Sequence, residues 1–366
     1  MKELKDLLRR AMIANAERGR KDPSFATVLV GICKFGDLFN NRRTERKIDA
    51  GIARFASRMG IEAGKELKED IWKAVVINLI EPDEYFFMRF DKRDAAARHD
   101  FVGDRERALL CGLLNDEKTG KIFSDKWQAY QRFRQYYKRE AFRYDGDDEA
   151  FRNFFAKHRR VIIKPEEASR GKGIFAADLD KGDTVDAVLG RMKGDAGNWH
   201  SYMVEEMVRE SAELRQFNDS VNTVRVATFR NAEGTRILFN HFRCGREGSV
   251  TDNTGSGGMF TAIDTGTGTC TTTFMDKDCR RYAEHPDSHV PIVGFRLPEW
   301  DELLKLVYEL AEVVPEQKYV GWDLAHTDEG WVMIEGNDRA QFGTQIPGQF
   351  GLRKEIEETF YKELGL

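Results

Sequence analysis

Cysteine is scarce in this chain, and its arrangement disfavours two common roles. The 366 residues contain five cysteines, which are scattered, odd in number and never arranged as CxxC. Disulfide frameworks and zinc sites both need cysteines at defined spacings. We therefore expect free thiols in a reducing compartment and predict a cytoplasmic protein.

Long apolar runs are also missing. No stretch approaches the ~20 apolar residues that a membrane-spanning helix needs. The charged first segment, residues 1–6, does not read as a signal peptide. The net charge of −4 gives no general attraction to nucleic acid or to membranes. We expect no nucleic-acid partner and no stable membrane insertion, and we leave an oligomer open.

Several widespread catalytic motifs are absent too. The chain has neither the P-loop GxxxxGK[ST] nor the Rossmann glycine fingerprint. It shows no Ser-His-Asp or Cys-His arrangement for nucleophilic catalysis. Any nucleotide site must therefore use another architecture, with chemistry that comes from charge and positioning.

The order of apolar residues predicts two kinds of structure. Up to about residue 150 they recur at helical spacing, and either Ser124 or Asp125 can cap a helix over 126–137. A packed layer of amphipathic helices is favoured over helices lying on a membrane. Later apolar runs are short and typical of strands, at 161–163, 202–204, 223–229, 236–242, 320–324 and 332–337. Helices are predicted at 303–314, capped by Asp301, and at 353–364. Strands broken by such helices indicate an α+β fold.

Three oxygen-bearing side chains lie on the last two of these runs. Asp323 is on the first, and Glu335 and Asn337 are two positions apart on the second. Alternate residues of a strand share a face, so Glu335 and Asn337 point together, and strand pairing can bring Asp323 beside them. Carboxylate and amide oxygens suit Mg²⁺, which leaves coordination positions for substrate phosphates. A solvated surface hairpin is the alternative.

Another group of residues is suited to phosphate. Lys164 ends a predicted strand and supplies a fixed cation. Glycines let backbone N–H groups approach phosphate oxygens closely. The loop that follows contains Ser169, Gly171, Lys172 and Gly173. A plain turn is the alternative for this loop taken alone.

The segment 204–208 has the form of an adenine hinge. Backbone groups of Glu206 and Val208 would pair with the base edge, and a merely solubilising role for Glu205 and Glu206 is the alternative.

Two arginines on later strands are suited to a phosphoryl group in transfer. They are Arg225 and Arg243, and structural ion pairs are the alternative for each. His241 lies beside them and could act as a base, but a histidine bonded to a neighbouring residue is favoured.

The order of these motifs resembles the ATP-grasp superfamily and, within it, the sugar-transfer-associated ATP-grasp group. The likeness covers roughly residues 80–350. It rests on 161–174, 202–208, 220–227, 252–258, 319–324 and 332–337, with shorter matches at 124–126, 285–287 and 298–301. It implies two α+β subdomains that clamp ATP, at about 121–210 and 211–366, after a mainly helical region of 1–120.

The resemblance implies roles in nucleotide binding. Lys126 and Lys164 would bind the α- and β-phosphates, the loop 169–173 would cover the triphosphate, and 205–208 would hold adenine. The ribose acid would be Glu213 or Glu210.

The resemblance also implies the catalytic centre. Asp323, Glu335 and Asn337 would hold two Mg²⁺ ions, with Glu335 bridging them. Better-known ATP-grasp ligases carry an arginine two positions before the aspartate, where this chain has Gly321. Arg243, with Arg225 beside it, is therefore expected to meet the transferred phosphoryl group.

The implied function is an ADP-forming ligase that uses ATP and Mg²⁺. It would activate a carboxylate as an acyl phosphate and couple it to an amine, on small-molecule or sugar-linked substrates of polysaccharide biosynthesis. A kinase that phosphorylates a hydroxyl and a non-catalytic nucleotide-binding protein are the alternatives. The complete set of Asp323, Glu335, Asn337, Lys164 and Arg225 argues against the last.

Overall fold

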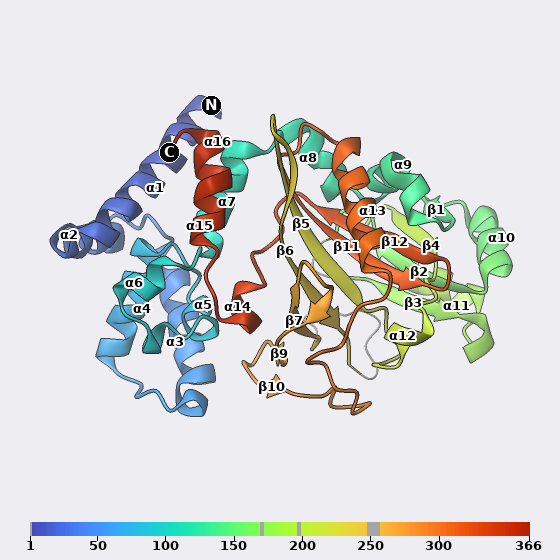
Figure 1. Cartoon of the computed structure of the whole chain (residues 1–366). Coiled ribbons are helices and arrows are strands. Elements are labelled where there is room, and N and C mark those ends of the chain that lie inside the picture. The colour runs from blue at the N-terminus through green and yellow to red at the C-terminus, as the bar shows by residue number, and fades with distance from the viewer. Residues whose placement is uncertain (1, 169–171, 196–198, 247–256) are drawn as a thin grey trace. The chain divides into compact units, whose positions relative to one another are not determined.

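The computed structural model describes residues 2–168, 172–195, 199–246 and 257–366. It divides into two compact units. Unit 1 comprises residues 1–115, 278–281 and 339–366, and unit 2 comprises 116–277 and 282–338. Residues 339–366, placed with the C-terminal domain from the sequence, thus pack within unit 1. Figure 1 shows that unit 1 is helical and that unit 2 combines helices with two sheets.

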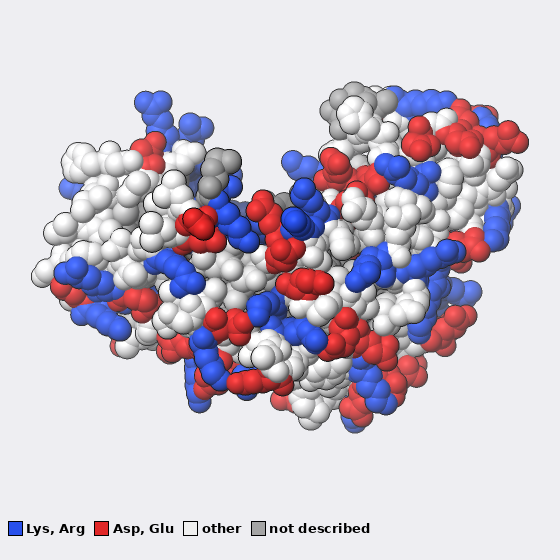
Figure 2. All heavy atoms as spheres, turned by 90° about the horizontal axis from the view of Figure 1, so that it is seen from above, with Lys and Arg blue, Asp and Glu red and all other residues white. Residues whose placement is uncertain are grey.

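Two properties of the described chain bear on its surroundings. None of its helices combines the length and the apolar character that a membrane-spanning segment needs. Figure 2 shows acidic and basic side chains interspersed over the visible face, as a net charge of only −4 leads one to expect.

Unit 1 confirms the predicted helical start of the chain. Its longer helices are α1 (Lys2–Lys21), α2 (Pro23–Phe35), α3 (Asn41–Met59), α4 (Lys65–Ile77) and α7 (Asp104–Leu114). Short helices α5 (Glu84–Phe87), α6 (Ala95–His99) and α14 (Gln345–Gly348) complete it. The predicted closing helix is confirmed as α15 (Arg353–Ile356), a π-helical stretch (Glu357–Tyr361) and α16 (Lys362–Leu364).

A buried carboxylate ties the early and late helices of unit 1 together. Glu106 on α7 is fully buried. Its oxygens accept hydrogen bonds from Arg20 at 2.7 Å, Arg353 at 2.9 Å and the Tyr361 hydroxyl at 2.5 Å. Burial alone would raise the pKa of Glu106, but the two arginines outweigh it and lower the pKa to about 2. The ionised form is therefore the one that stabilises the fold.

Glu106→Gln tests this linkage. Because the folded-state pKa is depressed, the stabilisation is present above the ordinary pKa and is lost as pH falls toward 2. The lowered pKa corresponds to about 3 kcal/mol. Urea unfolding at pH 7 should show a destabilisation of that order, and the difference from wild type should shrink at pH 3. Glu62→Gln, at an exposed position, is the control. An equal deficit at both pH values would contradict this role for the charge.

The small sheet of unit 2 has strand order β1-β4-β2-β3. The strands are β1 (Ala141–Tyr144), β2 (Arg160–Pro165), β3 (Phe175–Asp178) and β4 (Tyr202–Glu206). Its apolar face packs with α10 (Asp148–His158) and α11 (Val185–Gly194). Val161 and Ile163 belong to that core, so Lys164, the next residue along β2, projects from the opposite face.

The large sheet has strand order β10-β9-β7-β6-β5-β11-β12, with β8 paired to β7. The central strands are β5 (Thr223–Asn231), β6 (Gly234–Cys244), β7 (Met259–Asp264), β11 (Tyr319–Thr327) and β12 (Gly330–Asn337). Shorter strands are β8 (Thr269–Cys270), β9 (Phe274–Asp276) and β10 (Arg281–Tyr282). These elements confirm the strands predicted at 223–229, 236–242, 320–324 and 332–337.

Two helices cover one face of the large sheet. They are α9 (Lys126–Tyr137) and α13 (Trp300–Val313), and α8 (Glu117–Ser124) adjoins β12. Phe133 and Leu303 pack in one core with Val224 and Trp322. Since alternate strand residues change faces, the residues between these apolar positions point to the other side, away from α9 and α13.

The helix caps were predicted with mixed success. Of the two predicted caps, Asp125 is the one that caps α9, and it accepts the N–H of Gln128 at 2.9 Å. The cap proposed for α13 was wrong: Glu299 occupies the N-cap position and Asp301 lies in the first turn. A carboxylate in the first turn still interacts favourably with the helix dipole.

Candidate active site

One row of side chains crosses the open face of the large sheet. The strand register places Glu335 opposite Asp323, Asp323 opposite Arg225, and Arg225 opposite His241. Directly opposed residues on neighbouring strands project from the same face. The pairing therefore brings the two predicted metal carboxylates together, next to the first predicted catalytic arginine.

A bulge in β12 directs the predicted metal ligands Glu335 and Asn337 toward this row. One extra residue, Ile334, interrupts the pairing of β12 with β11. Met333 before it lies in the core, whereas Glu335 after it faces Asp323. A regular strand would send Met333 and Glu335 the same way, and bulges are known to redirect side chains at such places. Asn337 follows Glu335 by two positions, on the same side.

Asp323 is an enclosed carboxylate shared by two arginines. Only 1% of Asp323 is exposed. Arg225 donates to both of its oxygens at 2.6 Å, and Arg243 donates to Oδ2 at 2.7 Å. Burial would raise the pKa of Asp323, but the guanidinium groups outweigh it and hold the pKa well below its usual range. Both predicted catalytic arginines are thus fixed on one ionised carboxylate.

Glu335 has a different environment, since its side chain is exposed to solvent. Desolvation by the surrounding protein raises the pKa of Glu335, and the Asp323 carboxylate adds to this effect. The positive charges of Arg225, Arg243 and Lys164 act in the opposite direction. A like charge beside an accessible carboxylate makes this end of the row favourable for a cation.

The donor set fits a magnesium ion. Asp323 and Glu335 are opposed across the strands, and Asn337 adds an amide oxygen on the same side. A carboxylate offers about four lone-pair directions, and the arginine hydrogen bonds to Asp323 use three. Among the described residues, no group of three or more His, Cys, Asp or Glu side chains that could hold a metal ion is found, so the candidate set consists of two carboxylates and the Asn337 amide. Mg²⁺ takes few protein ligands, because it keeps water or substrate oxygens in its coordination sphere.

On the small sheet, Lys164 belongs to a second buried ion-pair group. Its Nζ lies 2.6 Å from Glu205 Oε1, and Arg139 donates to Glu205 Oε2 at 2.7 Å through Nε. Glu205 is only 1% exposed. Burial would raise its pKa, but Arg139 and Lys164 lower it. The Glu205 side chain is thus engaged by these two cations.

Lys126 stands near the same place, at the start of α9. Its N–H donates to the Glu166 carbonyl at 3.1 Å, and its Nζ donates to the Ala168 carbonyl. Burial lowers the pKa of Lys126, and the charges that act on it most strongly are those of Glu335, Lys164 and Glu205. The two predicted phosphate lysines therefore lie close together and near Glu335.

The predicted phosphate loop is described only in part. Ser169 and Gly171 lie outside the described residues, whereas Lys172 and Gly173 lie within them. Gly173 has φ +70°, and an added Cβ would come within 2.8 Å of Pro165. Both the backbone angle and the close contact require glycine at that position.

The hinge segment differs from the expectation. The strand ends at Glu206, and its N–H donates to the Glu140 carbonyl at 3.0 Å. That N–H is already used, so the hydrogen bond to a base expected from it is not open in this structure. Val208 follows the strand in an irregular segment and keeps its predicted role as a proposal.

The two candidates for the ribose acid are now distinguishable. Glu210 is buried and accepts two hydrogen bonds from Asn222, at 2.8 and 2.9 Å, so it has a structural role. Glu213 is exposed in the first turn of the short helix α12 (Ala212–Arg215). Glu213 therefore remains our candidate.

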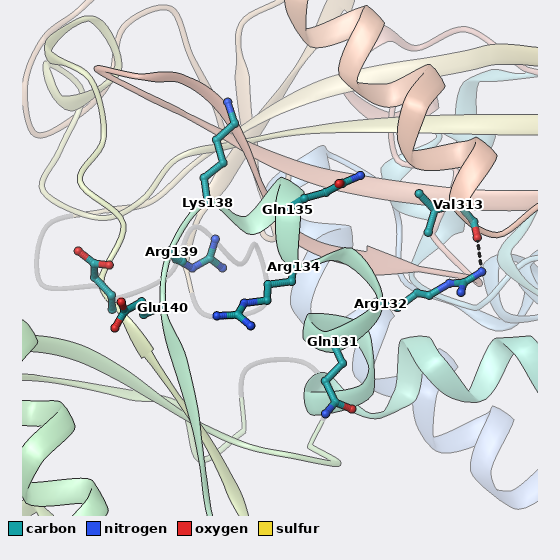
Figure 3. A pocket seen from close by; sticks show the side chains of 9 residues that line it. Gln131, Arg132, Arg134, Gln135, Lys138, Arg139, Glu140 and Val313 are labelled. Atoms are coloured by element: carbon teal, nitrogen blue, oxygen red, sulfur yellow. Dashed lines mark hydrogen bonds between the residues drawn. The ribbon is translucent and has the colours of Figure 1, made fainter.

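A separate hollow of about 750 Å³ lies beside the hinge. Its lining residues are Gln131, Arg132, Arg134, Gln135, Lys138, Arg139, Glu140, Glu206 and Val313. Figure 3 shows Arg134 and Arg139 pointing into it from α9 and the segment that follows. It contains Glu206 but none of the phosphate lysines or metal residues, so we do not place the nucleotide phosphates there.

Arg139 is the main residue that the sequence analysis missed. It lies two residues after α9, with no motif around it, and its importance comes from bonds to Glu205 and to the Met333 carbonyl at 2.7 Å. This role is visible only in the structure, where Arg139 bonds to a residue of β4 and to a residue of β12. The one local signal for Arg139 in the sequence was Glu205, a glutamate on an apolar strand that would need a cation if it were buried.

Unit 2 has the two sheets expected of an ATP-grasp protein: one carries Lys164, and the second carries Asp323, Glu335 and Asn337. The profile of the family described as sugar-transfer associated ATP-grasp matches residues 107–360, so the chain belongs to that family. A comparison with curated proteins finds no match.

Solved structures with related folds share little sequence with this chain. The ATP-grasp ligase PsnB, complexed with a phosphomimetic variant of minimal precursor, Mg and ADP, is 13% identical. That match covers 70% of this chain and 67% of PsnB, with a TM-score of 0.43. D-alanine–D-alanine ligase from Bacillus anthracis is 12% identical over 70% of this chain and 75% of the other, at 0.44. D-alanyl-alanine synthetase A from Vibrio cholerae is 13% identical over 67% and 62%, at 0.41. Such distant likenesses do not assign an activity.

Arg139→Leu tests the buried group on the small sheet. It would leave Glu205 enclosed with one cation fewer, which typically costs about 3 kcal/mol for a buried ion pair. Chemical denaturation should show a loss of that order. Arg152→Leu is the matched control: Arg152 pairs with Asp186 on the surface, where both side chains are exposed, and a loss below ~1 kcal/mol is expected. Equal losses in the two variants would show that Arg139 is not a key contact.

Proposed function

We propose that this protein is an ADP-forming ligase that uses ATP and Mg²⁺ to activate a carboxylate as an acyl phosphate and then couples it to an amine. The observation that carries the proposal is the row of Glu335, Asp323 and Arg225, extended by Arg243, with Lys126 and Lys164 close to Glu335. These residues supply metal ligands and cations but no nucleophile.

The nucleotide phosphates would lie between the two groups of charge. Lys126 and Lys164 would bind the α- and β-phosphates, and Lys172 and Gly173 would lie near the triphosphate. Asp323, Glu335 and Asn337 would hold Mg²⁺, with Glu335 shared between two ions. Bound magnesium would neutralise charge on the phosphate oxygens and align them for transfer.

Arg225 and Arg243 would act on the group in transfer. Their guanidinium groups already lie on one carboxylate, so little reorientation is needed when charge develops on the phosphoryl oxygens. The substrate carboxylate attacks the γ-phosphorus, the bond to the bridging oxygen breaks, and ADP leaves. The chain's contribution is positioning and charge neutralisation.

Membership of the sugar-transfer associated family supports sugar-linked substrates. A uronic acid is a sugar that carries a carboxylate, so uronic acids are the carboxylates to test first, with amino acids as amines. The role we propose is a step in the modification of a surface polysaccharide. The location we propose for the enzyme is the cytoplasm.

The experiment that tests the proposal is an ADP-release assay over uronic acids, amino acids and small peptides. Release that needs both a carboxylate and an amine supports the ligase. Phosphate retained on a stable hydroxyl product supports a kinase instead. No turnover with any pair, despite nucleotide binding, would favour a non-catalytic binder.

Glu335→Ala should lower ATP turnover by ~10²-fold or more, because it removes metal charge at the phosphoryl group. The fold should persist, since Glu335 is exposed and packs in no core. Turnover and circular dichroism check both statements. Glu329→Ala, in the turn of the same hairpin, should leave turnover unchanged. Retained activity in the Glu335 variant would refute the metal assignment.

Lys164→Ala should weaken nucleotide binding. A ligand that binds only the native state raises the melting temperature, and at a fixed concentration the rise is larger for tighter binding. Wild type should therefore be stabilised by millimolar Mg²⁺-ATP, and the variant should show a much smaller shift at the same concentration. Lys157→Ala removes an exposed lysine of the same unit as a control. A flat titration for wild type would count against nucleotide binding altogether.

A further inference from the structure

His241 differs from the other two buried histidines of unit 2. His285 and His326 are buried, and both of their ring nitrogens take part in hydrogen bonds. His241 is 4% exposed, and its Nδ1 is buried without a hydrogen-bond partner in the described part of the chain. The expected bond to a neighbouring residue is therefore not found there.

The position of His241 links it to the site. It lies on β6 opposite Arg225 and two residues before Arg243, on the same face of the sheet. Two phenyl rings fix the plane of its imidazole. The ring centroids of Phe239 and Phe260 lie 6.4 and 6.0 Å from that of His241, at interplanar angles of 10° and 66°.

An unsatisfied buried nitrogen has a cost. Leaving a buried donor or acceptor without a partner costs roughly 1–3 kcal/mol, so such atoms in native proteins need a reason, and a missing ligand is one. In this protein the unsatisfied nitrogen of His241 lies directly beside two arginines of the proposed centre. A purely structural residue at that position would be expected to have a partner, as His285 does.

The chemistry of the neighbours indicates what His241 can bind. Arg225 and Arg243 have only hydrogen-bond donors, and the Asp323 oxygens are already engaged by them. Burial and the two arginines hold the pKa of His241 well below its ordinary value, with Asp323 opposing them. The neutral imidazole therefore keeps a nitrogen lone pair, the acceptor that a substrate N–H needs at this end of the row.

We propose that His241 binds the attacking amine of the second half-reaction, by accepting a hydrogen bond from its N–H beside Arg225 and Arg243. This inference rests on the proposed ligase function. The row then orders the substrates along the sheet. Phosphates lie over β12 and β11, the acyl phosphate over β5, and the amine over β6.

The coupling step forms one bond, breaks one bond and moves one proton. The amine nitrogen forms a bond to the acyl carbon, and the bond from that carbon to the phosphate oxygen breaks with its electron pair on phosphate. The proton that the nitrogen loses ends on the departing phosphate. His241 orients the amine through its N–H and keeps no proton.

The first experiment needs no substrate. His241→Leu removes an unsatisfied nitrogen, so the melting temperature of the free protein should stay the same or rise. His285→Leu removes a histidine with satisfied nitrogens and should lower it by several degrees. If both variants fall equally, His241 is a structural residue and the inference is overturned.

The second experiment uses hydroxylamine, a small amine that traps acyl phosphates as hydroxamates. With a carboxylate that supports ADP release, His241→Leu should lower kcat/KM for hydroxylamine about tenfold or more and leave KM for ATP unchanged. His241→Gln, which retains an acceptor oxygen, should recover part of the loss. An equal fall in amine-independent ADP release would place His241 in the phosphoryl site and contradict the inference.

The two experiments separate the two ideas. If wild type forms no hydroxamate with any uronic or amino acid, the ligase function fails. The melting comparison then still decides whether His241 is structural or faces a ligand.

Discussion

The arrangement of the candidate site depends on one buried carboxylate, Asp323, which fixes two arginines. Its two oxygens accept three hydrogen bonds from Arg225 and Arg243, so the guanidinium groups are fixed before any substrate arrives. Without Asp323 the two cations would lie close together on one sheet face and repel each other. With Asp323 between them, the two arginines and the carboxylate together carry one net positive charge, which can stabilise a phosphoryl oxygen.

The small sheet contains a second buried carboxylate that is paired with two cations. Glu205 is enclosed between Lys164 and Arg139, as Asp323 is between its two arginines. In each case a carboxylate that water hardly reaches orients two cations, and each sheet contributes one such group. Burial makes these interactions strong and also makes the loss of a single partner costly. Positioning in this protein therefore depends on electrostatics that are already paired in the free chain.

Local rules predicted much of the fold but only part of the site. Asp125 as a helix cap and Lys164 on a strand follow from residue types and strand alternation, whereas the opposition of Asp323 and Glu335 also needs the bulge at Ile334. Arg139 and the free nitrogen of His241 do not, because they depend on which distant segments pack together. The same reason explains why the N–H of Glu206 is not open to a base in this structure, since it donates to the Glu140 carbonyl of a neighbouring segment.

The bulge at Ile334 has an evolutionary consequence. Because strand faces alternate, a strand of the same length that paired regularly through Ile334 would leave the Glu-x-Asn motif readable in the sequence while turning both side chains toward the hydrophobic interior. A homologue can thus retain every signature letter and still lose the proposed metal site. In this family the pairing of β12 with β11, and not the motif alone, decides which face of the sheet those side chains occupy.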